Sequence, residues 1–127
     1  MSTPTGLQFE HVSGCLTVRV SGPSQFQQRV SIAHAIVEAL SKHAVNAMLI
    51  DLRNTDGPVT FMDRYQLGEM AAQYLPKIPL AALMREDQTD RQLIGQQVAR
   101  NRGANLQVFT EEALAVAWLK EYAATSH

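Results

Sequence analysis

Charged residues that could support acid–base or anion-binding chemistry follow two apolar runs of the sequence. Asp51 and Arg53 come directly after the first run, and Arg85 and Asp87 come after the second. Two carboxylates beside arginines can differ in pKa, as acid–base catalysis requires, or the arginines can hold an anion. Asp–Arg pairs of this kind are more often ordinary surface ion pairs in exposed loops. Such pairs contribute little to stability and need no catalytic role. We therefore interpret these residues as a polar rim and not as a catalytic centre.

Thr60 is the second candidate for chemistry, because it stands before a helical pattern with Asp63 three residues later. This spacing is typical of a capping box, in which the two side chains satisfy free amide groups at the start of a helix. The same position suits a phosphoryl group, since a helix N-terminus stabilises added negative charge. We expect Thr60 to be an N-cap, with a phosphoacceptor as the alternative.

The cysteine and the histidines do not indicate a nucleophile or a metal site. Cys15 lies in a β-branched segment without the basic neighbour that a reactive thiol needs, so we expect a buried structural thiol. The histidines lack the spacing of a zinc site; they are His11, His34, His43 and His127. Neither a Gly-rich phosphate loop nor a Gly-x-Ser-x-Gly motif is present. We expect no metal, no cofactor and no catalytic activity.

The segment after Thr60 is rich in side chains suited to adaptable contacts. Met62, Tyr65, Met70 and Tyr74 follow within fifteen residues, and most of them are expected in the core. If Met62 and Tyr65 are exposed, this helix is the first place to look for a protein interface or the mouth of an apolar ligand site. The candidate docking or ligand surface consists of Asp51, Arg53, Thr60, Met62, Asp63, Tyr65 and Arg85.

The composition is that of a folded domain near electrical neutrality. Of the 127 residues, 46% are hydrophobic and 18% are charged, which excludes the disordered class. The net charge of −1 provides no field to hold a phosphate backbone, so nucleic acid is not an expected partner. Arg91, Arg100 and Arg102 form one basic cluster, interpreted as a complement to a helix C-terminus, with an anionic lipid or partner surface as the alternative.

No segment indicates secretion or insertion into a membrane. One cysteine cannot form an internal disulfide, and residues 1–6 lack the basic start and apolar core of a signal peptide. Apolar runs such as residues 78–84 are far shorter than the roughly 18 residues of a bilayer span. We expect a cytoplasmic protein with no transmembrane segment. Residues 1–127 are expected to form a single domain with a flexible N-terminus at residues 1–6.

Hydrophobic periodicity and turn residues predict nine elements in the order ββαβαβαβα. The turn Ser13-Gly14 predicts a hairpin, apolar residues at helical spacing predict helices, and fully apolar segments predict covered strands. The expected strands are residues 7–11, 15–20, 47–50, 78–84 and 106–109, and the helices follow caps at Ser24, Thr60, Thr89 and Thr110. Residues 54–58 are expected to form a loop, and Gly103 to follow the third helix in the left-handed conformation.

The connections predict an α/β fold. Three strand-to-strand connections through single helices imply right-handed crossovers and a mixed, mostly parallel sheet flanked by helices, with its first two strands antiparallel. The inner face of the first helix is expected to include Val30, Ala33, Val37 and Leu40. The final helix is expected to bury Leu114, Ala117, Trp118 and Tyr122.

Two stretches carry a family resemblance. From Met48 the chain reads Met-Leu-Ile-Asp-Leu-Arg, and from Ala99 it reads Ala-Arg-Asn-Arg-Gly-Ala-Asn-Leu-Gln-Val-Phe-Thr-Glu-Glu-Ala-Leu-Ala-Val-Ala-Trp-Leu. With the element order, they resemble the SpoIIAA-like group of small bacterial proteins. These proteins are related in fold to STAS domains, found in sulfate transporters and anti-sigma-factor antagonists, and to the CRAL-TRIO lipid-binding fold.

The resemblance implies two functions. The first is a non-catalytic regulatory or protein-interaction module. STAS proteins of this kind are switched by phosphorylation of a serine in an Asp-Ser-Ser-Gly or similar turn, but this chain lacks that serine and has Tyr65 in its place. The alternative is a carrier or sensor of a small hydrophobic or lipid-like ligand, as the CRAL-TRIO relation implies. A homodimer is a further candidate, because packed helices with leftover apolar surface commonly pair.

Overall fold

A computed structural model describes residues 6–12, 14–23, 26–56, 60–75, 77–90 and 92–125. Its strands are β1 (Leu7–Val12), β2 (Cys15–Pro23), β3 (Ala47–Asp56), β4 (Pro79–Leu83) and β5 (Asn105–Phe109). Its helices are α1 (Phe26–Lys42), α2 (Phe61–Tyr74), the short 3₁₀ helix η1 (Glu86–Gln88), α3 (Ile94–Asn101) and α4 (Glu112–Thr125). The α/β fold class and the order of the main elements are confirmed.

The five strands form one sheet in the order β1-β2-β3-β4-β5. β1 pairs antiparallel with β2, and all the other neighbouring strands are parallel, as predicted. The register shifts between β2 and β3, because β3 has two residues and β2 only one between the pairs Arg19–Asp51 and Ser21–Asn54. This bulge reverses the alternation of side chains, so Thr55 lies with Leu52 beneath α2.

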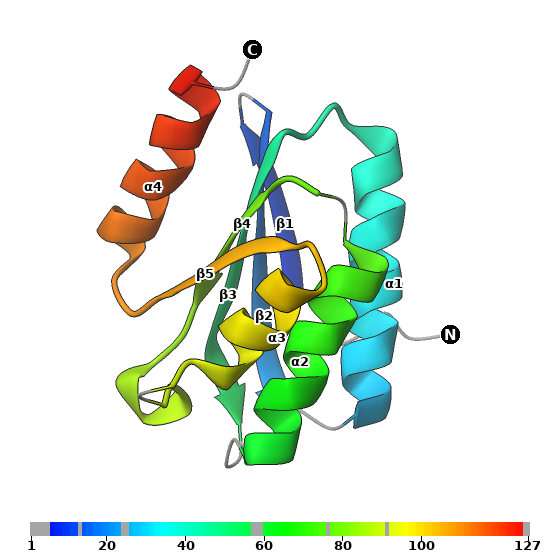
Figure 1. Ribbon diagram of the computed structural model, residues 1–127. Helices are drawn as coiled ribbons and strands as arrows, with labels where there is room; N and C mark the ends of the chain where they lie inside the picture. The colour runs from blue at the N-terminus through cyan, green and yellow to red at the C-terminus, as the bar shows by residue number, and fades with distance from the viewer. Residues whose placement is uncertain are drawn as a thin grey trace.

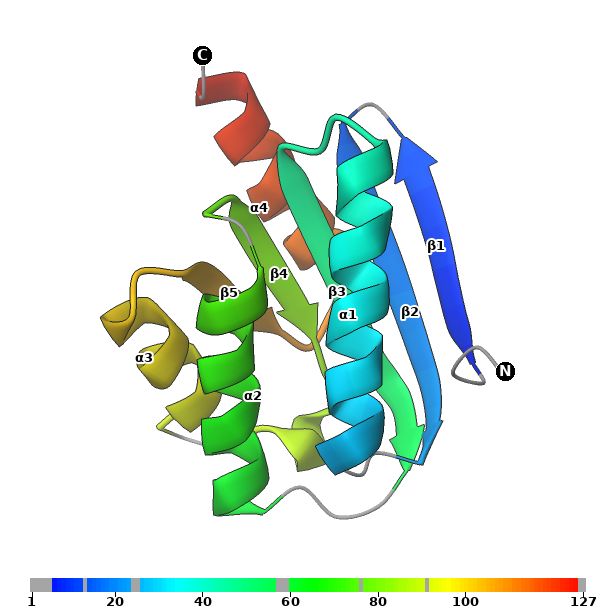
Figure 2. The same cartoon turned by 90° about the vertical axis from the view of Figure 1, so that its right-hand side faces the viewer.

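The helices that the structure describes cover the sheet unequally: α1, α2 and α3 lie on one face, and only α4 among them lies on the other (Figures 1 and 2). The larger buried cluster includes Val18, Ile36 and Leu80 on the three-helix face. The smaller cluster includes Leu49, Leu83 and Leu119 on the α4 face. Polar groups near the carboxyl ends of the strands are therefore divided between two separate environments.

Several local predictions are confirmed. Thr60 caps α2: its hydroxyl accepts a hydrogen bond from the Asp63 amide, and the Asp63 carboxylate accepts one from the Thr60 amide. Gly103 follows α3 with a φ of 95°, in the left-handed region. The predicted cap Ser24 lies outside the described residues.

Other local predictions are wrong. β3 does not end near Asp51 but continues to Asp56, because its last residues pair with Ser21, Gly22 and Pro23 of β2. This pairing also replaces most of the predicted loop over residues 54–58.

Thr89 does not cap the third helix. It ends η1, where its amide donates to the Glu86 carbonyl. α3 begins only at Ile94, after Leu93 in the left-handed conformation (φ 49°). Similarly, α4 begins at Glu112, so the residue before it is Glu111 and not Thr110.

The buried face of α4 is rotated from the predicted one, and the predicted inner face of α1 is wrong at Val37. α4 buries Ala115 and Leu119, whereas Leu114 is 56% exposed. In α1, Ala33 and Ile36 are buried and Val37 is exposed. Among the described residues, none of the helices has both the length and the apolar character needed to cross a bilayer.

Candidate functional site

Four charged side chains meet on the α4 face of the sheet. Asp51, 2% exposed, accepts hydrogen bonds from Arg19 Nη1 at 2.8 Å and from Arg53 Nε at 3.0 Å. The carboxylate of Glu112, at the start of α4, accepts hydrogen bonds from both terminal nitrogens of Arg19 at 3.1 Å. It also accepts one from Arg53 Nη2 at 3.0 Å. These contacts join β2, β3 and the first turn of α4, and we call the four residues the ion cluster.

The ion cluster keeps both of its carboxylates ionised. Burial alone raises the pKa of Asp51, but the hydrogen bonds from Arg53 and Arg19 outweigh it and hold that pKa below its usual value. The hydrogen bonds from Arg19 lower the pKa of Glu112. Neither carboxyl group is held protonated near neutral pH, so the cluster lacks the general acid that a catalytic carboxylate pair needs.

Arg85 and Asp87 form a separate pair, at 2.9 Å. Arg85 Nη1 also donates to the backbone carbonyls of Arg53 and Thr55, which ties the segment after β4 to the end of β3. The side-chain hydrogen bond from Arg85 holds the pKa of Asp87 below its usual value, as the hydrogen bonds from Arg53 and Arg19 do for Asp51. The predicted polar rim is therefore two sets of ion pairs, and the sequence prediction missed Arg19 and Glu112 because they lie far from Asp51 along the chain.

Hydrogen bonds from an arginine of α1 hold the start of α2 against that helix. Asp63 accepts a hydrogen bond from Arg29 Nη2 at 3.1 Å, and Gln66 accepts one from the same nitrogen at 3.3 Å. The backbone hydrogen bond from Thr60 contributes most to lowering the pKa of Asp63. Arg29 is 9% exposed although it is charged, and its pairing with Asp63 accounts for its burial.

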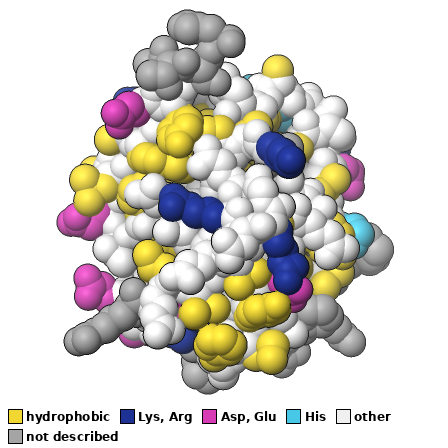
Figure 3. Space-filling view, viewed as in Figure 1, with side chains coloured by type: hydrophobic (Ala, Val, Ile, Leu, Met, Phe, Trp, Pro, Cys, Tyr) yellow, Lys and Arg dark blue, Asp and Glu magenta, His cyan; other side chains and the backbone are white. Residues whose placement is uncertain are grey.

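Two large apolar side chains are exposed beside this cap. Phe61 and Met62 are each 58% exposed. Hydrophobic side chains gather at the lower end of the view in Figure 3, where α2 begins. Tyr65 is half-buried instead, and its hydroxyl accepts a hydrogen bond from Arg102 at 3.2 Å. Of Met62 and Tyr65, whose exposure was in question, only Met62 is thus exposed, and the sequence prediction missed Phe61.

The predicted surface therefore divides between two faces of the sheet. Asp51 and Arg53 belong to the ion cluster under α4, while Thr60, Met62 and Asp63 lie at the start of α2 on the three-helix face. Arg102 of the predicted basic cluster pairs with Glu69 of α2, and Arg100 donates to the Leu106 carbonyl of β5. Arg91 lies outside the described residues.

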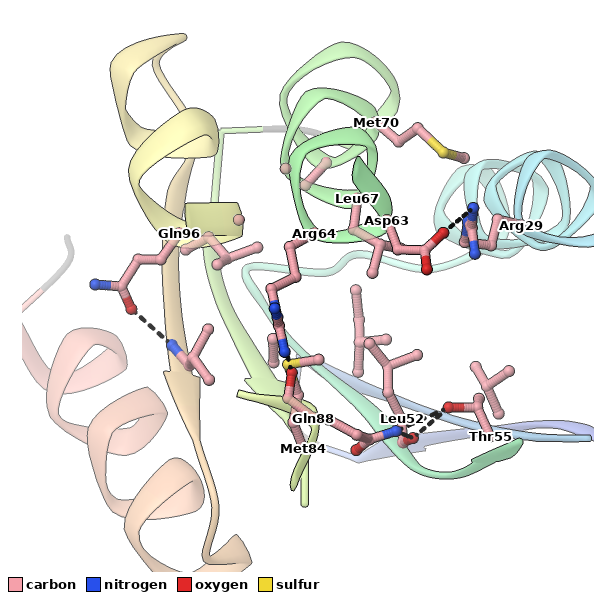
Figure 4. Close-up of a pocket in the computed structure, with 18 of the residues that line it drawn as sticks. Arg29, Leu52, Thr55, Asp63, Arg64, Leu67, Met70, Met84, Gln88 and Gln96 are labelled. Atoms are coloured by element: carbon pink, nitrogen blue, oxygen red, sulfur yellow. Dashed lines mark hydrogen bonds and ion pairs between the residues drawn. The ribbon is translucent and has the colours of Figure 1, made fainter. Parts of the chain in front are cut away.

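A cavity of about 150 Å³ lies between the sheet and helices α1, α2 and α3. Its walls are mainly aliphatic; they include Ile36, Ile50, Leu52, Leu67, Ala71 and Ala82. Figure 4 shows Arg64 extending from α2 toward Gln88 and Met84, whereas Asp63 points away toward Arg29. The cavity is thus an apolar space with polar groups at one end.

A buried glutamine closes that end. Gln88 is 1% exposed, and its amide nitrogen donates to the Leu52 carbonyl at 3.0 Å and to the Thr55 hydroxyl at 3.1 Å. Its amide oxygen accepts from the Arg85 amide at 2.7 Å. The β3 bulge places Thr55 where it can take part, so the network fixes the polar end of the cavity.

α2 packs closely against α3, while its side toward the sheet carries a small residue. A Cβ atom on Gly68 would lie 2.4 Å from the carbonyl oxygen of Gly95, so the two helices meet through a glycine pair. The underside of α2 carries the small residue Ala71 between Leu67 and Leu75, which leaves the space toward the sheet incompletely filled.

The surroundings of the cysteine and of the possible metal ligands do not favour chemistry. Cys15 is half-buried, and burial raises the pKa of its thiol, which makes it a poor nucleophile. Among the described residues, no three side chains of the His, Cys, Asp and Glu types come together as a metal site would require.

Comparison with known proteins identifies the fold. No protein-family model matches the chain, and neither does any curated protein. Among solved structures, an anti-sigma factor antagonist from Mycobacterium paratuberculosis superimposes with a TM-score of 0.65 at 15% identity, over 90% of this chain and 92% of that one. An uncharacterized protein with a SpoIIAA-like fold from Shewanella loihica superimposes with a TM-score of 0.54 at 18% identity, over the same shares. The resemblance seen in the sequence is confirmed at the level of the fold: this chain has the SpoIIAA-like fold.

Proposed function

We propose that this protein is a non-catalytic regulatory module that binds a partner protein through the start of α2. The observation that carries the proposal is the exposure of Phe61 and Met62 beside the Thr60–Asp63 capping box. Large apolar side chains on a rigid helix start are suited to anchor a partner. The description of one structural neighbour as an anti-sigma factor antagonist supports a protein partner.

In this proposal the ion cluster stabilises the fold and does not contact the partner. Asp51 is buried and bonded on several sides, so a partner cannot reach it without breaking the joint between β3 and α4. Arg53 is held by the same joint. We therefore define the docking surface as Thr60, Phe61 and Met62.

Thr60 remains the candidate phosphoacceptor. Its side chain is exposed, but its hydroxyl lies 2.9 Å from an oxygen of the ionised Asp63 carboxylate. A phosphoryl group there would gain from the helix N-terminus and would repel Asp63. Phosphorylation would thus open the capping box and change the docking surface. Mass spectrometry of the protein from native extracts tests this, and finding no modified Thr60 under any growth condition would count against it.

Comparative affinity capture tests the docking surface. The bait proteins are the wild type, a Phe61→Ser/Met62→Ser double variant, and Leu114→Ser, which changes an equally exposed apolar residue on α4. We expect a partner that the wild type and Leu114→Ser retain and the double variant loses. Equal retention by all three baits would refute this docking surface.

A second function, binding a small hydrophobic molecule, is favoured by the cavity beneath α2. Its aliphatic walls offer burial to an apolar group, and its polar end can orient one. Native mass spectrometry after gentle purification should show retained small molecules if the protein is a carrier. A ligand-free protein that captures one stable partner would favour the docking module instead.

We further propose a cytoplasmic location and self-association as a homodimer. The single cysteine suits a reducing compartment. Exposed Val12 and Phe9 on β1 supply apolar surface for self-association. Sedimentation equilibrium of the purified protein measures its mass, and a monomer at all concentrations would contradict the dimer.

A further inference from the structure

We propose that the cavity beneath α2 binds a compact carboxylic acid, with its apolar part among the aliphatic walls and its carboxylate on Arg64. The inference rests on the second function proposed above, because it names the chemical class of the ligand. It also names the residue that would distinguish this class from neutral molecules. Three features of the cavity carry it: its size, its walls and the environment of Arg64.

The size of the cavity sets the size of the apolar group. A closed apolar cavity of about 150 Å³ is large enough for one benzene ring, and this cavity has about that volume but is partly open to solvent. It is too small to enclose the long acyl chain of a membrane lipid, which has several times as many carbon atoms as a benzene ring. The group that the cavity itself encloses is therefore a single aromatic ring, or an aliphatic group of similar size.

The walls select an apolar group over a polar one. Ile50, Leu52 and Ala82 form the sheet side, and Leu67 and Ala71 form the helix side. The polar groups beside them are already engaged, since Gln88 and Thr55 bond each other and the backbone. A polar group placed among the aliphatic side chains would lose its bonds to water without replacement.

Arg64 supplies the positive charge at the polar end. Its Nε donates a hydrogen bond to the backbone carbonyl of Gln88 at 3.3 Å, and its Nη2 donates one to the backbone carbonyl of Thr89 at 3.4 Å. Both distances exceed the usual 2.9–3.0 Å of such bonds. Among the described residues, no carboxylate lies within ion-pair distance of Arg64. A ligand carboxylate could thus replace two long hydrogen bonds to neutral carbonyl oxygens with a bidentate ion pair.

The other charged side chains around the cavity are paired, hydrogen-bonded or exposed. Arg29 pairs with Asp63, which also holds the helix cap. Asp90 accepts a hydrogen bond from the Ile94 amide at the start of α3. Asp56 also lines the cavity but is exposed at the end of β3. Arg64 is therefore the cation best placed to bind an anion, and its flexible stem lets it move toward one.

Three probes test the size and the charge of the ligand. Phenylacetate carries one ring and a carboxylate, 2-phenylethanol carries the same ring and a neutral hydroxyl, and dodecanoate carries a long chain. Binding is measured by titration with detection by NMR of the ¹⁵N-labelled protein. Nuclear Overhauser contacts from the ring protons to Leu67 and Met84 locate the bound ring. We expect wild-type protein to bind phenylacetate about tenfold more tightly than 2-phenylethanol, as one charge-assisted contact provides.

Three variants identify the residues responsible. Arg64→Met keeps the apolar stem and removes the charge, so it should bind the two ring probes equally. Ala71→Leu fills the cavity and should bind neither, while Ala117→Leu makes the same change at an exposed position of α4 and should bind like the wild type. Circular dichroism and melting show whether each variant is folded. If Ala71→Leu does not fold, the Overhauser contacts in the wild type still decide the location.

The outcomes separate this inference from the function on which it rests. If neither ring probe binds the wild type, ligand binding in this cavity fails altogether. If 2-phenylethanol binds as tightly as phenylacetate, or Arg64→Met keeps the preference, the cavity binds ligands but the carboxylate assignment is wrong. If dodecanoate binds more tightly than phenylacetate, the compact size is wrong and a lipid-like ligand is favoured. A preference for phenylacetate that disappears in Arg64→Met supports the inference.

Discussion

Asp51 shows how much one buried carboxylate can contribute to this fold. It accepts hydrogen bonds from Arg19 and Arg53, and the same arginines bind Glu112 at the start of α4. Replacing Asp51 with Asn removes the charge and keeps the size. Removing one partner of a fully buried ion pair costs about 3–5 kcal/mol. Because both arginines are partly exposed and keep Glu112, we expect a loss of about 2 kcal/mol in the free energy of unfolding.

The effect of Asp51 should depend on pH. Since the pKa of Asp51 is lower in the folded protein than in the unfolded chain, its contribution is present above the unfolded pKa of about 4 and is lost as the pH falls through the folded pKa. Urea unfolding at pH 7 and at successively lower pH measures this, and Asp51→Asn should show a shallower acid loss. Asp87→Asn is the matched control, because its ion pair is exposed and should have little effect. Equal destabilisation by the two variants would contradict the prediction.

Thr60 allows a second prediction for a single residue. Thr60→Ala removes the hydroxyl that accepts the Asp63 amide, so we expect a loss of about 1 kcal/mol in unfolding free energy. Thr60→Ser keeps the hydroxyl and should stay close to the wild type. Thermal or urea unfolding of the three proteins measures the difference. An unchanged stability in Thr60→Ala would mean that the capping box does not hold the start of α2.

The residues of the site differ in how far the sequence could predict them. The Thr60–Asp63 box was predictable because its partners are three residues apart and the chemistry is local. The partners of Asp51 were not, because Arg19 and Glu112 reach it only when β2, β3 and α4 come together. Arg64 and Gln88 meet through long-range packing in the same way. Interactions within one turn can be predicted, whereas those between distant elements need the fold.

At the scale of elements, the contact between α2 and α3 is the most sensitive to substitution. Alanine at position 68 would favour the helix by about 1 kcal/mol over glycine. Its Cβ would nevertheless lie 2.4 Å from the Gly95 carbonyl oxygen and 3.0 Å from the Cβ of Val98, which forces the helices apart. We expect Gly68→Ala to be destabilising by about 1–2 kcal/mol in urea unfolding. Gln73→Ala, at an exposed position of α2, is the control and should not lower stability. A more stable Gly68→Ala would disprove the close contact.

The elements that the sequence predicted best are those with strong local patterns. The β1–β2 hairpin, the core of each strand and the start of α2 follow from turn residues, apolar runs and a capping box. The extension of β3 to Asp56 was missed because Asn54 and Asp56 are typical of turns, and only pairing with β2 makes them a strand. The start of α3 was missed because Leu93 adopts a left-handed conformation that leucine seldom takes.

At the scale of the whole molecule, the two faces of the sheet are unequally protected. Three helices cover one face, and their loose fit over the sheet leaves the cavity. On the other face α4 is the only helix in the part of the chain that the structure describes, and the buried side chains of its cluster there include Leu49, Leu83, Ala115 and Leu119. The ion cluster fixes the first turn of the same helix. We infer that the stability of the α4 layer depends on a small number of contacts.

Leu119 tests this dependence. It is 4% exposed and packs in the cluster under α4, so Leu119→Ala should leave a hole that the tightly packed strands cannot close. We expect a loss of about 3 kcal/mol in urea unfolding. Leu114→Ala, on the same helix but 56% exposed, should change stability little. The sequence pattern placed Leu114 in the core instead, so the pair of variants decides between the two faces of α4. A larger loss from Leu114→Ala would mean that α4 is rotated from the orientation described here.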